Sequence, residues 1–84
     1  MPYLNSGVKA SLDDGRLPMA PGELNYMISK MVDDYITRKG LSYNTLNEVI
    51  GAMQCAQLEL YRCVAAPYED YKCRENGGVY LNAK

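Results

Sequence analysis

The chain has 84 residues, and nine Lys and Arg against ten Asp and Glu give it a formal net charge of −1. Its basic residues are scattered and form no basic stripe in the sequence, which argues against nonspecific binding to a nucleic-acid backbone. Its apolar runs are far shorter than the roughly 20 residues of a membrane helix. We therefore expect one small domain over residues 1–84, with neither nucleic acid nor membrane as a partner.

The first 21 residues predict an irregular leader that contains one short helix. Ser6 is placed to cap this helix, which runs to Leu12 and turns Val8 and Leu12 inward. Residues 17–22 hold two prolines and predict a loop.

A longer helix is predicted over about residues 22–39, where apolar residues recur at steps of three and four. Gly40 is suited to end it, and Ser42 is suited to cap a second helix over about residues 43–66. The second helix has its own apolar face, formed by Leu46, Val49, Ile50, Met53, Ala56, Leu60 and Val64. The short gap between the two helices predicts an antiparallel helical hairpin.

Pro67 lacks an N–H and is expected to stop or kink the second helix. It is also suited to begin a short third helix over about residues 67–76, ended by Gly77 and Gly78. The apolar tail Val79–Leu81 is expected to dock on the core or on a neighbouring subunit. Because no alternating pattern of useful length predicts strands, the expected fold class is all-α.

Three cysteines and the lack of histidine limit how so small a core is stabilised. An odd count without CxxC spacing argues against a disulfide framework and against zinc. We expect three reduced thiols, at least two of them packed between helices, and neither metal nor cofactor. The N-terminal residues lack the pattern of a signal peptide, which predicts a cytoplasmic protein. Oligomerisation remains as the stabilising device, so we expect a homo-oligomer, most simply a dimer.

The side of the second helix opposite its apolar face is unusual for a solvated surface. It carries Asn47, Glu48, Gly51, Cys55, Leu58, Glu59 and Arg62. A glycine in mid-helix costs about 1 kcal/mol relative to alanine, and an apolar leucine favours cover. We expect this side to be covered by the third helix, by the N-terminal segment or by a second subunit.

Such cover would partly bury Glu48, Glu59 and Arg62, and buried charges are either paired or part of a site. One interpretation is a structural network of Glu and Arg. The other is a binding site in which the arginine holds an anion and tyrosines stack on a ring. The residues of that candidate site are Arg62, Glu59, Glu48, Asn47, Tyr26, Tyr68 and Tyr71. No catalytic residue is assigned, because histidine and the common catalytic motifs are missing from the sequence.

Four sequence blocks, taken together, have the specificity of a family signature. They are GELNY at 22–26, NEVIG at 47–51, ELYRCVAAPYEDYK at 59–72 and NGGVY at 76–80. These blocks resemble a family of small uncharacterised proteins of tailed phages and bacteria. The chain departs from the family pattern at Cys63, where arginine is frequent, and at Gly78, where an acid is usual. The resemblance implies the cytoplasm of a bacterial host cell and no established activity.

Two functions from different classes follow from these patterns. The first is a non-enzymatic accessory binding protein of the phage type, which sequesters a small anionic, nucleotide-like ligand as a homo-oligomer. The alternative is a protein–protein interaction module, either an inhibitor of a host protein or a minor assembly component. The acidic and tyrosine-rich segment 68–75 suits a protein surface.

Overall fold

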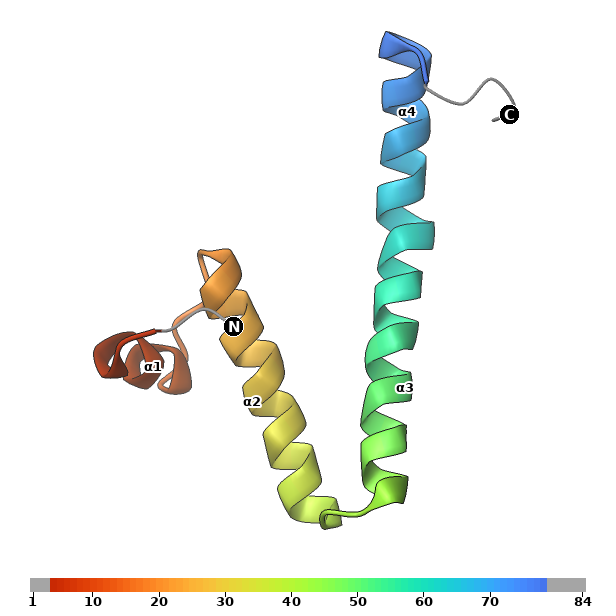
Figure 1. Cartoon of the computed structure of the whole chain (residues 1–84). Coiled ribbons are helices and arrows are strands. Elements are labelled where there is room, and N and C mark those ends of the chain that lie inside the picture. The colour runs from red at the N-terminus through yellow and green to blue at the C-terminus, as the bar shows by residue number, and fades with distance from the viewer. Residues whose placement is uncertain (1–3, 79–84) are drawn as a thin grey trace. The chain divides into compact units, whose positions relative to one another are not determined.

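The computed structural model of the chain describes residues 4–78, and these fall into two compact units. Unit 1 is Met1–Val49 and unit 2 is Ile50–Lys84. Helices make up both units, and no strand occurs within residues 4–78 (Figure 1). The predicted all-α fold class is therefore confirmed. The single domain stays a prediction, and the expected docking of Val79–Leu81 lies outside the described residues.

Helix α1 (Ser6–Asp13) opens unit 1. Its N-cap is Asn5 and not the predicted Ser6, because the extended backbone at Asn5 lets its side chain turn back onto the first turn. There the Asn5 Oδ1 accepts a hydrogen bond of 2.8 Å from the Val8 N–H. Leu12 is 1% exposed and faces inward as predicted.

Helix α2 (Pro21–Lys39) begins at a proline, which suits a first helical position because its missing N–H would have no partner there. Its N-cap, Ala20, makes no side-chain cap hydrogen bond, and the Glu23 side chain in the first turn instead holds the preceding loop. The Glu23 Oε1 accepts hydrogen bonds from the Met19 N–H at 2.9 Å and from Arg16 Nη1 at 3.1 Å. The bond from Arg16 is the main cause that lowers the pKa of the Glu23 carboxyl.

Two tyrosines of α2 connect it to the neighbouring helices within unit 1. The Tyr26 hydroxyl donates to both carboxylate oxygens of Asp13, at 2.9 and 3.1 Å. The Tyr35 hydroxyl donates to Glu48 Oε1 at 2.8 Å. Each carboxylate raises the pKa of its tyrosine, because it accepts the proton that ionisation would remove.

The connection between α2 and α3 (Tyr43–Leu60) has the predicted caps. Gly40 adopts φ 92°, a region that favours glycine, and its N–H bonds the Ile36 carbonyl at 2.8 Å. Ser42 Oγ accepts from the Thr45 N–H at 3.1 Å. Thr45 and Val49, in the part of α3 that belongs to unit 1, are buried at 5% and 8% exposure.

Unit 2 is one continuous run of helix from Ile50 to Asn76 (Figure 1). The rest of α3 passes into a π-helical turn, η1 (Tyr61–Ala65), and then into α4 (Ala66–Asn76). Pro67 therefore does not interrupt the run of helix, and it lies in the first turn of α4, where the third helix was predicted to begin. In an α-helix, the proline ring would clash with the carbonyl of Cys63, four residues earlier, and the proline nitrogen has no hydrogen to donate to it. The wider π-helical turn before Pro67 accommodates both effects. The Ala66 N–H accordingly bonds the carbonyl of Tyr61, five residues back.

Candidate interaction surface

Glu59 and Arg62 are the two predicted site residues that the structure joins by a hydrogen bond. Arg62 Nη2 donates to Glu59 Oε2 at 2.9 Å, and the Cys63 thiol lies 3.8 Å from the same oxygen. The two charged side chains are 77% and 60% exposed, in the order Arg62 and Glu59. The two side chains therefore pair at an i,i+3 spacing, and the described chain does not bury them; their cover by a second subunit stays a prediction.

The other predicted site residues have separate environments. Tyr26 is bonded to Asp13 and Glu48 is bonded to Tyr35, so both link helices of unit 1. Asn47 lies exposed in unit 1, whereas two tyrosines lie exposed in unit 2. Those two are Tyr68, at 59% exposure, and Tyr71, at 49%. The structure therefore does not join the seven residues into one bonded cluster.

The side of α3 that carries Gly51, Cys55 and Leu58 is open in unit 2. Leu58 is 67% exposed, and a Cβ atom added to Gly51 would meet nothing within 4 Å. The third helix cannot cover this side as predicted, because α4 continues the axis of α3 through η1. A second subunit at this side stays a prediction.

The thiols are also more open than predicted. Cys55, Cys63 and Cys73 are all unpaired and exposed, so the expected packing of two of them between helices does not occur within the described chain. The expectation that all three are free thiols agrees with the structure.

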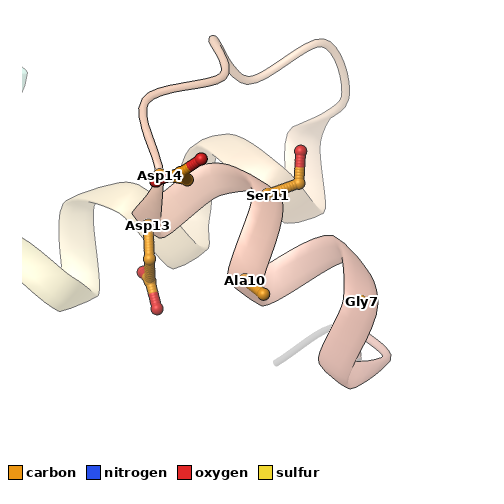
Figure 2. Close-up of a pocket in the computed structure, with 5 residues that line it drawn as sticks. All are labelled: Gly7, Ala10, Ser11, Asp13 and Asp14. Atoms are coloured by element: carbon orange, nitrogen blue, oxygen red, sulfur yellow. The ribbon is translucent and has the colours of Figure 1, made fainter.

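A shallow recess lies on α1, and Figure 2 shows the residues that line it. They are Gly7, Ala10, Ser11, Asp13 and Asp14. The side chains of Ser11, Asp13 and Asp14 point in different directions and do not converge on one point (Figure 2). Two carboxylates without a cation among the lining residues repel an anion, and none of the predicted site residues takes part.

Replacement of Arg62 by methionine tests the exposed ion pair. Because both partners face water, we expect the free energy of unfolding to change by no more than about 0.5 kcal/mol. Urea denaturation followed by circular dichroism measures this, with Glu59→Gln as the matched control that removes the other charge. A loss of several kcal/mol in Arg62→Met alone would show that the pair is buried in the assembled protein.

Unit 2 exposes a row of apolar side chains along one side, which we call the apolar stripe. It consists of Ile50, Met53, Ala56, Leu60, Val64, Tyr68 and Tyr71. The six large members are between 47% and 60% exposed. No residue from 50 to 78 is buried. The sequence predicted the first part of this face as helix packing, and within residues 50–78 no side chain of the unit covers it.

The π-helical turn η1 keeps the stripe straight. Leu60, Val64 and Tyr68 follow one another at steps of four, which advance by about 400° in an α-helix and so drift around its axis. A π-helical turn, whose hydrogen bonds join residues five apart, contains more residues per turn than an α-helix. A step of four residues through it therefore advances by less, which cancels much of this drift. Tyr61 and Glu69 show the result, because their side chains meet at 3.2 Å although eight residues separate them. That carboxylate raises the pKa of Tyr61 by its charge and its hydrogen bond.

The first part of the helix that carries the stripe also has few charged residues. The residues from Ile50 to Leu58 carry no charged side chain on any side. An exposed helix normally carries charged residues on the face opposite its apolar face. The lack of charge over residues 50–58 is therefore unusual for an exposed segment.

Among residues 4–78, no group of three or more metal-ligating side chains could hold a metal ion. No helix in the same range is both long enough and apolar enough to cross a membrane.

Comparison with known proteins gives a family without an assigned function. The family model described as "Domain of unknown function (DUF6899)" matches residues 1–79. The match includes the leader and α1, which precede the blocks that the sequence resemblance used. No curated protein and no solved structure matches the chain.

Proposed function

Since the chain belongs to this family of unknown function, we propose that it is a non-enzymatic protein–protein interaction module whose apolar stripe binds a partner helix. The observation that carries the proposal is the row of six large apolar side chains, each about half exposed, on one side of unit 2. Apolar patches of several hundred Å² on a protein surface are typical of interaction sites.

The energetics of an isolated helix support the same function. A single helix in water is marginally stable, because most helical stability in proteins comes from packing of an apolar face. Residues 50–78 of unit 2 offer their helix no such packing, since none of them is buried. A partner that covers Leu60, Val64 and Tyr68 would supply it.

Sequestration of a small anionic ligand by a homo-oligomer is the second candidate. Arg62 favours it, because its guanidinium has five N–H groups and a carboxylate takes up only part of them. We rank it second because Arg62 offers an anion one cation on an open surface, with the Glu59 carboxylate beside it. From the sequence resemblance we further propose an accessory protein of the phage type in the cytoplasm of a bacterial cell.

Photo-crosslinking in cells tests the interaction module. A photoreactive residue at Leu60 should form a covalent adduct with a protein of defined mass, because the stripe is covered there. The same residue at Arg62 is the matched control, since it lies two positions on and so on nearly the opposite side of the helix. The proposal fails if the Leu60 position gives no adduct, or if both positions give the same adducts.

A thermal-shift screen with nucleotides and inorganic phosphate distinguishes the second candidate. A protein that sequesters an anion should show a higher Tm with its ligand. We expect no shift from any of these anions.

A further inference from the structure

We propose that the apolar stripe pairs with the same stripe of a second copy of this chain, antiparallel, with the two Leu60 side chains facing each other across a two-fold axis. This inference rests on the proposed function, and it names the partner helix. The midpoint of the stripe lies at Leu60, because the stripe extends from Ile50 to Tyr71.

The exposed area of the stripe suits a stable pair. A buried aromatic side chain removes 150–250 Å² from water and an aliphatic one somewhat less, so half-exposed members offer roughly 100 Å² each. Six such side chains on each of two copies would bury about 1,200 Å² in total, at the lower end of standard interfaces. The stripe runs for about 33 Å along the helix at 1.5 Å per residue, so the contact would be long and narrow.

The distribution of charge favours the antiparallel orientation. Every charged side chain of the described part of unit 2 lies at Glu59 or beyond it, and residues 50–58 have none. A parallel pair would place Lys72 next to Lys72 and Glu75 next to Glu75, where like charges repel. An antiparallel pair about Leu60 instead lays residues 62–70 against the uncharged residues 50–58 of the other copy, so Lys72 and Glu75 lie far from their own counterparts.

Side-chain size and type are also complementary about Leu60. Ala56 and Val64 lie four residues on either side, so a small side chain would face a larger one. Met53 and Tyr68 lie seven and eight residues away, which brings a thioether against an aromatic ring, a favourable contact. A stripe with these properties complements itself, as a two-fold interface requires.

Disulfide trapping tests the pairing and its direction. In a background with Cys55, Cys63 and Cys73 replaced by serine, Ala56→Cys and Val64→Cys would be made separately, one of them with an affinity tag. Under mild oxidation the mixture of the two should form a mixed disulfide, and each variant alone should stay unlinked. A parallel pair would instead link each variant to itself, which would overturn the proposed orientation.

A control pair tests the side of the helix. Leu58→Cys would be mixed with Arg62→Cys in the same background. These two positions lie two residues on either side of Leu60, so they too would face each other across the axis, but they lie outside the stripe. We expect no link from this mixture, and a link here without one between positions 56 and 64 would place the interface on the opposite side and overturn the proposal.

Sedimentation of the unmodified chain makes the test independent of the variants. We expect twice the chain mass of 9.4 kDa at micromolar concentration. A single-chain mass together with unlinked cysteine variants would overturn self-pairing. In that case a Leu60 adduct to a different protein would still support the interaction module, whereas the lack of any Leu60 adduct would overturn both.

Discussion

Replacement of Leu60 by aspartate should leave the protein as single chains with much less helix in unit 2. Leu60 is 60% exposed within its own chain and lies at the middle of the apolar stripe. In a pair of stripes, two carboxylates would meet at the two-fold axis, without partners and with like charge. Removal of such a group from water costs several kcal/mol, so we expect association to weaken by at least about a thousandfold. Sedimentation measures the mass, and far-ultraviolet circular dichroism measures the helix content.

The matched control for this variant is Leu58→Asp. Leu58 is 67% exposed on the same helix, but it lies outside the stripe, so its replacement should leave the assembled mass unchanged. Equal loss of association in both variants would show that the interface does not discriminate the two sides of the helix. A Leu60→Asp protein that still sediments as a pair would contradict the role of the stripe.

Replacement of Leu12 by alanine should unfold much of unit 1 and leave unit 2 helical. Leu12 is 1% exposed, and the other buried side chains of the described chain are Thr45 and Val49. A buried leucine replaced by alanine costs about 2–5 kcal/mol, through lost burial and the remaining cavity. So small a core has little stability to spare, because a whole domain has only about 5–15 kcal/mol.

Hydrogen exchange followed by mass spectrometry resolves this effect along the chain. Peptides from residues 4–49 should lose protection in Leu12→Ala, and peptides from residues 50–76 should keep theirs. Leu17→Ala is the matched control, since Leu17 is 75% exposed and its truncation should change stability by no more than about 0.5 kcal/mol. Uniform loss of protection across the chain would contradict the division into two units.

Local chemistry made the ends of the helices predictable. Gly40 and Gly77 have positive φ angles of 92° and 81°, and each ends a helix where the sequence predicted it. Ser42 caps α3 by its own hydroxyl. The wide turn at 61–65 was not predictable in this way, because a proline after a helical pattern is compatible with a stop, a kink or a π-helical turn.

Burial and tertiary partners were less predictable, because they depend on residues far apart in the sequence. An apolar face shows that a helix needs cover, but it does not show which molecule supplies it. The sequence therefore predicts packing of Leu60 and Val64 within the hairpin, whereas both are exposed in the chain. Tyr26 and Glu48 were assigned to a ligand site for their chemistry, although each bonds a partner 13 residues away. One signal in the sequence pointed to these bonds. Tyr26 and Tyr35 both lie on α2, and each has a carboxylate 13 residues away on a neighbouring helix.

The exposed thiols give each chain three attachment points in an oxidising environment. Cys55, Cys63 and Cys73 follow one continuous helix at separations of eight and ten residues, which correspond to about 12 and 15 Å. A disulfide requires Cα atoms less than about 7 Å apart, so no two of these cysteines join within one chain while the helix persists. Every disulfide therefore joins two chains, and chains with three exposed thiols can link into branched networks without a defined size. Reducing conditions are thus a requirement for an assembly of fixed stoichiometry.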